Sequence, residues 1–81
     1  MTRKTIPVKA YRKQDFKVLL MNPSIDLTDE RAVANAHKIH HLKWNQLLEE
    51  TCKGKFPESE WKTAHILSED VVRAIIERKA S

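Results

Sequence analysis

Glycine is nearly absent from this chain, with Gly54 alone among 81 residues, and proline occurs three times. β sandwiches and barrels need many tight turns, which depend on these two residue types, so the composition excludes both architectures. It also leaves no glycine-rich loop of the kind that surrounds phosphates in nucleotide-binding enzymes. The sequence therefore favours helices joined by short connections.

Cysteine and long apolar runs are also scarce. The single cysteine, Cys52, has no partner for an internal disulfide, which is typical of proteins in a reducing compartment. The chain has no run of 18 apolar residues and no apolar segment near its start, so we expect neither membrane spanning nor secretion. With 41% hydrophobic and 32% charged residues, we predict one small cytoplasmic domain.

Acidic residues are missing before Asp15. Residues 1–20 carry six basic side chains and one acidic one, a net charge of +5, whereas residues 21–81 carry nine basic and ten acidic ones, a net charge of −1. Such asymmetry is typical of segments that contact nucleic acid or an acidic protein surface. Residues 1–13 lack a helical apolar period, so we predict a flexible basic arm attached to a single helical domain over 14–81. A short edge strand over 5–11 is the alternative.

The stretch from 28 to 52 contains neither proline nor glycine and has signals at both ends. Thr28 suits an N-cap position, and Asp29 and Glu30 follow in the first turn, where the helix dipole favours acids. Gly54, just after Lys53, suits a left-handed C-terminal cap. These signals predict one central helix of about 23 residues, roughly 35 Å long.

This predicted helix has more apolar surface than one partner helix covers. One face combines six residues at helical spacing: Val33, Ala36, His40, Trp44, Leu47 and Leu48. Ile39 and Leu42 lie outside that face, so we predict that they form an interface with a partner, with homodimerisation as one possibility. Trp44 and Trp61 are expected in the core.

The segments on either side favour shorter helices. Residues 14–21 are rich in apolar side chains, and Asp15 suits an N-cap, although a strand over 17–21 remains open. Residues 57–79 form either one helix or two helices divided at Ser68, a second plausible N-cap. A separate helix over 69–79 would have an inward face of four apolar residues: Val71, Val72, Ile75 and Ile76. The predicted fold class is all-α, a small bundle of three to four helices around the 28–52 helix.

Three histidines within the central helix suggest a metal site. His37 and His41 lie one turn apart, and a third ligand such as His65 would complete a zinc site. The metalloprotease motif, however, requires Glu after the first histidine, where this chain has Lys38. We therefore interpret the histidines as packed or solvated side chains and predict no metal and no cofactor.

Catalytic motifs are equally weak. Cys52 is the one nominal nucleophile, and the dipole at a helix C-terminus raises rather than lowers a thiol pKa. The acidic pairs are typical of solvated helix ends. We predict that the protein is not an enzyme.

The main hypothesis is a small regulatory protein that binds nucleic acid through its basic arm. Basic side chains would neutralise phosphates, and one tyrosine would stack on a base. The residues assigned to this role are Arg3, Lys4, Lys9, Tyr11, Arg12, Lys13 and Lys17. The alternative is a protein–protein interaction module (an adaptor, an antitoxin-like protein or an inhibitor) that uses Ile39 and Leu42.

Overall fold

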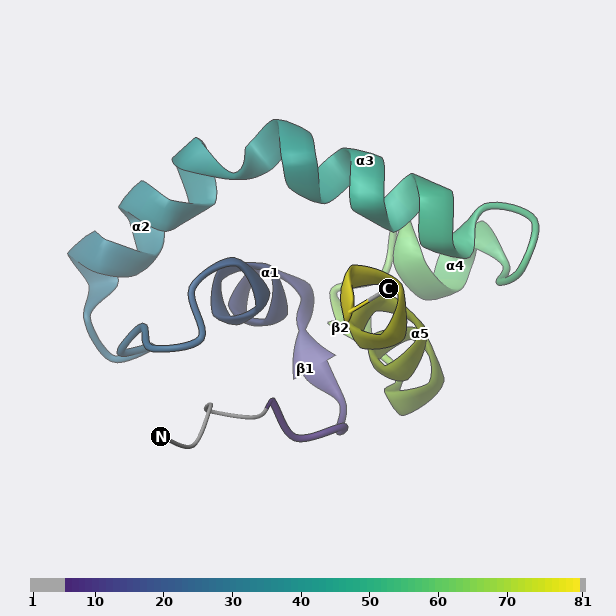
Figure 1. Ribbon diagram of the computed structural model, residues 1–81, viewed down its shortest axis with the longest axis horizontal. Coiled ribbons are helices and arrows are strands. Elements are labelled where there is room, and N and C mark those ends of the chain that lie inside the picture. The colour runs from purple at the N-terminus through teal and green to yellow at the C-terminus, as the bar shows by residue number, and fades with distance from the viewer. Residues whose placement is uncertain (1–5, 81) are drawn as a thin grey trace.

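The structure is a computed structural model that describes residues 6–80, and it is mostly helical (Figure 1). The described residues form five helices and one pair of two-residue strands. In chain order these are β1 (Tyr11–Arg12), α1 (Lys13–Met21), α2 (Glu30–Ile39), α3 (His41–Cys52), α4 (Glu58–Trp61), β2 (Ile66–Leu67) and α5 (Glu69–Ala80). The predicted helical character is confirmed, whereas the small sheet was not predicted. None of the described helices has the length and apolar character required to cross a bilayer.

The predicted central helix is divided at His40. The helical residues of α2 end at Ile39 and those of α3 begin at His41, and His40 between them has φ −100° and ψ 11°. Backbone hydrogen bonds still bracket the junction, from His40 N to Ala36 O at 3.1 Å and from Trp44 N to His40 O at 2.9 Å. The prediction of one continuous helix is therefore corrected to two helices placed end to end. Because of this division α2 packs on α1 while α3 packs on α5, as Figure 1 shows beneath the α2–α3 arch.

The N-cap of α2 also differs from the prediction. Asp29, not Thr28, is the N-cap of α2, since its Oδ1 accepts a hydrogen bond from Ala32 N at 3.1 Å. Thr28 instead donates from both its backbone N–H and its hydroxyl to Asp26 Oδ1, which fixes the preceding turn. At the other end the prediction is confirmed, because Gly54 has a left-handed φ of +79° just after the C-cap of α3.

The first helix begins three residues earlier than expected. Asp15 lies within the first turn of α1 rather than at its N-cap, and its carboxylate accepts from Arg12 Nε at 2.9 Å. The helix continues to Met21, so the strand alternative over 17–21 is wrong. Before it, β1 pairs antiparallel with β2 in the register Tyr11 with Leu67 and Arg12 with Ile66. This pairing fixes the two residues that immediately precede α1.

The C-terminal segment is not one helix. It contains α4, β2 and α5, so the predicted helix that follows Ser68 is confirmed, whereas the segment before Ser68 is helical only over the four residues of α4. Ser68 Oγ accepts from Val71 N at 3.4 Å, as expected for an N-cap side chain. The inward face of α5 is also as predicted, since Val71, Val72 and Ile75 are buried.

Aromatic rings form the centre of the core. Phe16 of α1 stacks on Tyr11 with ring centroids 5.4 Å apart and meets the edge of Trp44 at 5.9 Å. Trp44 and Trp61 are both buried, which confirms their predicted core positions. A second cluster, around Val18 and Val33, joins α1 to α2. Thus α1 contacts both halves of the α2–α3 pair, and its remaining face is available for a site.

Candidate anion-binding site

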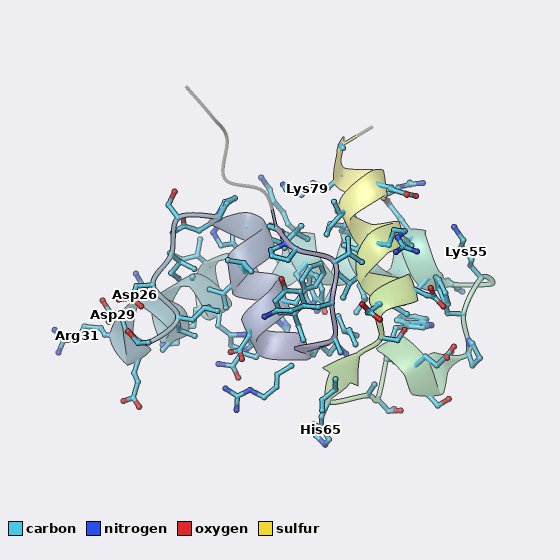
Figure 2. The ribbon with its side chains drawn as sticks, turned by 90° about the horizontal axis from the view of Figure 1, so that it is seen from below. Asp26, Asp29, Arg31, Lys55, His65 and Lys79 are labelled. Atoms are coloured by element: carbon cyan, nitrogen blue, oxygen red, sulfur yellow. The ribbon has the colours of Figure 1, made fainter. Side chains whose placement is uncertain are left out.

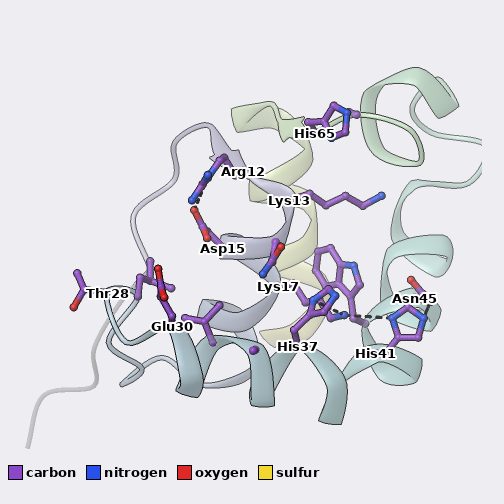
Figure 3. A pocket seen from close by; sticks show the side chains of 16 residues that line it. Arg12, Lys13, Asp15, Lys17, Thr28, Glu30, His37, His41, Asn45 and His65 are labelled. Atoms are coloured by element: carbon purple, nitrogen blue, oxygen red, sulfur yellow. Dashed lines mark hydrogen bonds and ion pairs between the residues drawn. The ribbon is translucent and has the colours of Figure 1, made fainter.

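The candidate site is centred on a buried lysine in α1. Lys17 is only 2% exposed, and its Nζ lies 3.2 Å from Nδ1 of His37 in α2 and 3.4 Å from Nδ1 of His41 in α3. Figure 3 shows the labelled side chains of Lys17, His37 and His41 close together near the junction of α2 and α3. Within residues 6–80, Lys17 has no ion pair with a carboxylate. A buried ammonium whose partners are two neutral rings is an uncommon arrangement.

The hydrogen bonds of this cluster fix the histidine tautomers. An ammonium group only donates, so Nδ1 of both rings must accept, and each neutral ring then carries its proton on Nε2. His41 Nε2 lies 3.2 Å from the side-chain amide of Asn45. The amide atom at that distance is Asn45 Nδ2, so a donor at His41 Nε2 requires the amide to be turned until Oδ1 faces the ring, which is allowed because amide nitrogen and oxygen are assigned from the surrounding network.

Burial lowers the pKa values of both Lys17 and His37. The pKa of Lys17 is lowered below its ordinary 10.5, first by burial and then by the charge of Lys13. The pKa of His37 is lowered below 6.5 by burial, then by Lys17, then by His41. His37 is therefore neutral at pH 7, in agreement with its role as a hydrogen-bond acceptor.

A pocket of about 780 Å³ opens beside this cluster. Its lining comes from the start of α1, from α2 and α3, and from the segment before β2. The basic and imidazole side chains that line it are Arg12, Lys13, Lys17, His37, His41 and His65, and the acidic ones are Asp15 and Glu30. The Asp15 carboxylate already pairs with Arg12. The pocket therefore has many N–H donors and few free acceptors, which suits an anion.

Lys13 connects the rim of this pocket to the segment before β2. Its backbone N–H donates to His65 O at 2.8 Å, and its Nζ donates to Lys62 O at 2.8 Å. The pKa of Lys13 is lowered, chiefly by burial. The second ammonium group is thus held by a carbonyl rather than by an acid.

The residues predicted to contact nucleic acid divide into several environments. Arg3 and Lys4 lie outside the described residues. Lys9 and Arg12 are exposed, Lys13 is half-buried, and Lys17 is buried, so Lys17 is not the accessible phosphate contact that we predicted.

Tyr11 requires a similar correction. It is 8% exposed, it stacks on Phe16, and its hydroxyl donates to Pro7 O at 2.7 Å. Lys9 Nζ lies 5.1 Å from the centre of the same ring. The ring belongs to the core, and the prediction that it stacks on a base is wrong because no open face remains for one.

The two residues assigned to a partner interface are accessible. Ile39 is 67% exposed and Leu42 is 81% exposed, and they lie on either side of the His40 junction. Their exposure agrees with the prediction that neither belongs to the buried face. Contact with a partner stays a prediction.

Metal and thiol chemistry find little support in these positions. His37 and His41 face each other at 6.4 Å between ring centroids, yet the described part of the chain brings together no set of three histidine, cysteine or acidic side chains suited to a metal. Lys17 occupies the space between the rings. Cys52 is fully buried, and burial, more than any nearby charge, raises the pKa of its thiol.

Comparison with protein-family models, curated proteins and solved structures gives no match. The function is therefore argued from the residues and their geometry alone.

The sequence reasoning missed the central role of Lys17. It treated this lysine as one of seven similar contacts in the arm, although one signal was present. Lys17 is the single charged residue in the run from Phe16 to Met21, so a helix over this run has little polar surface on which to place it. A single lysine in such a run indicates either a side chain that extends along the apolar surface to reach water or a buried charged group that has a function.

Proposed function

We propose that this protein is a small non-enzymatic regulator that binds nucleic acid through phosphate contacts from its first twenty residues. The observation that supports the proposal most directly is the composition of the pocket beside α1, where three basic side chains and three histidines meet two carboxylates. Electrostatic attraction of this kind acts on the phosphate backbone and does not depend on the base sequence of the nucleic acid. The single buried thiol is consistent with a reducing cytoplasm as the proposed location.

Exposed and buried basic residues would have different roles in such binding. Lys9 and Arg12 are exposed and reach the phosphates of a bound strand directly. Lys13 is half-buried at the pocket and contributes to binding mainly through long-range electrostatic attraction of the phosphates. Because Tyr11 is occupied in the core, we expect weak sequence preference and strong dependence on salt.

Fluorescence anisotropy with a labelled single-stranded oligonucleotide tests the proposal over a salt series. We expect Kd on the order of 10⁻⁴ to 10⁻⁶ M at physiological salt, tightening steeply at low salt. Substituting Lys9→Ala and Arg12→Ala together should flatten the slope of log K against log salt by about 0.7 for each lost contact.

The matched control is Lys79→Ala, which removes one positive charge from the last turn of α5. Figure 2 shows Lys79 at the opposite end of the molecule from His65, which lines the pocket. We expect this control to retain the slope. Absence of binding at low salt contradicts the proposal, as does an equal loss in the control.

A test of the arm's contribution must leave the core intact, which substitutions achieve and a deletion of residues 1–13 does not. Removing residues 1–13 would delete Tyr11 and half of the sheet, so lost binding would only report unfolding. Substituting Arg3→Ala and Lys4→Ala removes two charges and leaves every described contact in place. We expect weaker binding with an unchanged circular dichroism spectrum.

A protein–protein interaction module is the second candidate, and the exposure of Ile39 and Leu42 favours it. If these side chains join two copies of the chain, sedimentation should show a dimer that the double substitution Ile39→Glu and Leu42→Glu dissociates. Both positions are exposed, so the monomer should stay folded. A sedimentation profile that is identical for the two proteins counts against self-association through this surface.

A further inference from the structure

We propose that the pocket between α1, α2 and α3 binds a phosphate monoester group, with Lys17, His37 and Lys13 as its principal contacts. Two sources offer this chemistry, free inorganic phosphate and the terminal phosphate of an oligonucleotide. The second source rests on the proposed function, whereas the site itself does not.

The fold leaves one buried positive charge uncompensated. The Lys17 side chain is more than nine-tenths buried and lines the pocket, and no carboxylate among the described residues pairs with it. His37 and His41 accept two of its three N–H groups without neutralising it. A bound anion would supply the missing counter-charge, and the third N–H would be its donor.

Several hydrogen-bond donors surround the same space. Since both Nδ1 atoms accept from Lys17, the Nε2 atoms are donors, and that of His37 has no partner within the described residues. The Lys13 ammonium has further N–H groups beyond the one given to Lys62 O. Three donors, two from α1 and one from α2, match the three terminal oxygens of a phosphate monoester better than the two oxygens of a carboxylate.

The size of the pocket also suits a phosphorylated ligand. A volume of about 780 Å³ lies within the range of small-ligand sites and exceeds what one phosphate group fills. The remaining space can hold the sugar that carries a terminal phosphate. A phosphodiester within a strand has only two free oxygens, and nucleotides on both sides of it would have to fit around the pocket. A terminal phosphate has three free oxygens and only one attached nucleotide, so it matches the pocket better.

Binding at this site should be coupled to protonation of His37. The charged and titratable groups around the pocket are Lys13, Lys17 and Asp15 from α1, Arg12 from β1, Glu30 from α2, His41 from α3 and His65 from the segment before β2. In the free protein, burial and the neighbouring Lys17 keep His37 neutral. A phosphate dianion favours a neighbouring imidazolium; once protonated, His37 Nδ1 no longer accepts from Lys17, and both side chains can then donate to the anion. Affinity should therefore increase as pH falls toward about 6, below which the phosphate itself becomes a monoanion.

The first experiment is an NMR titration of the histidine ring resonances with inorganic phosphate, against chloride at equal ionic strength. We expect the His37 and His41 signals to move and the pKa of His37 to rise. His40 provides an internal control, because it lies between them in the sequence but does not line the pocket. Absence of a phosphate-specific shift at His37 overturns the proposal.

The second experiment compares a 5′-phosphorylated oligonucleotide with a 5′-hydroxyl oligonucleotide of the same sequence. Charge-assisted hydrogen bonds to the terminal group should make the phosphorylated strand bind about tenfold more tightly. Lys17→Met and His37→Gln should each abolish this preference, while His40→Gln should retain it. His37 is only half-buried, so His37→Gln tests the site even if the lysine variant unfolds.

The two experiments separate this proposal from the proposed function. If both oligonucleotides bind equally and inorganic phosphate leaves His37 unmoved, the site is refuted while nucleic-acid binding stands. If inorganic phosphate shifts His37 but neither oligonucleotide binds, the site stands with free phosphate as its ligand and the proposed function fails. A preference that survives in Lys17→Met and in His37→Gln also refutes the site, because the contacts would then lie elsewhere.

Discussion

Replacing Lys17 by methionine should make this protein more stable. The substitution keeps an unbranched side chain of similar length in a position that is 98% buried, so the apolar contacts of the stem are retained. It removes an ammonium group that has no carboxylate partner within residues 6–80. If the lysine is kept to bind an anion, the free protein carries it at a cost in stability.

Two opposing terms set the magnitude. Taking an ammonium group out of water costs several kcal/mol even after the protein relaxes. Its two hydrogen bonds to imidazole nitrogens, at 3.2 and 3.4 Å, are long, and His37 and His41 retain access to water when the lysine is gone. We therefore expect a net gain of about 1–2 kcal/mol, which for a domain of this size raises Tm by about 5–15 °C.

Thermal unfolding followed by circular dichroism measures this difference, with Lys38→Met on the exposed face of α2 as the matched control. The control should change stability by less than about 0.5 kcal/mol. Phosphate should raise the Tm of the native sequence but not that of Lys17→Met, so the difference between them should narrow as phosphate is added. A Lys17→Met protein that melts below the native one would refute the reasoning, because the lysine would then be a stabilising structural contact.

The dependence on pH has a defined sign. A lysine whose pKa is lower in the folded state binds fewer protons there than in the unfolded chain, so its charged form destabilises the fold below the folded pKa. This penalty disappears as pH rises through the folded pKa toward 10.5. The stability advantage of Lys17→Met should accordingly shrink in that alkaline range, and urea unfolding at a series of pH values measures it.

Three further predictions concern the scaffold. Thr51 Oγ1 is a buried side-chain atom without a hydrogen-bond partner among the described residues, so Thr51→Val should stabilise the protein by about 1 kcal/mol in urea unfolding. Gly54 has φ +79° with nothing within 4 Å of an added Cβ, so Gly54→Ala should lower the free energy of unfolding by about 1 kcal/mol through backbone strain alone. Cys52 is fully buried and burial raises its pKa, so a thiol reagent should label it only after denaturant is added.

The features predicted correctly from the sequence depend on neighbouring residues. The left-handed turn at Gly54 and the cap at Ser68 each follow from one side chain and its immediate backbone. The inward face of α5 and the core positions of Trp44 and Trp61 follow from helical periodicity and residue size. Such signals are readable without knowledge of the fold.

The features that the sequence did not predict depend on contacts between distant segments. No residue near His40 is a proline or glycine, so nothing local marks the division between α2 and α3. It matches a tertiary requirement, since α2 covers α1 while α3 covers α5. Likewise Tyr11 was assigned to an arm because its strand partner, Leu67, lies 56 positions later in the chain.

The candidate site was unpredictable for the same reason. His37 and His41 suggested a metal because their spacing places them on one side of a helix, but the group between them comes from α1. A lysine there has the opposite consequence, since it repels a cation and attracts an anion. The histidines were therefore a valid signal of a site, and the sign of its ligand depended on a residue that only the fold brings to them.

The basic side chains of the first twenty residues thus include exposed ones and a buried one, and salt affects the two kinds differently. Lys9 and Arg12 are exposed, and salt screens their contribution strongly. Lys17 is buried, so its field in the pocket is screened far less. If strand ends and strand backbones are both bound, raising the salt concentration should weaken backbone binding much more than the preference for a terminal phosphate. A preference that falls in parallel with total affinity would mean that Lys17 does not contact the bound phosphate.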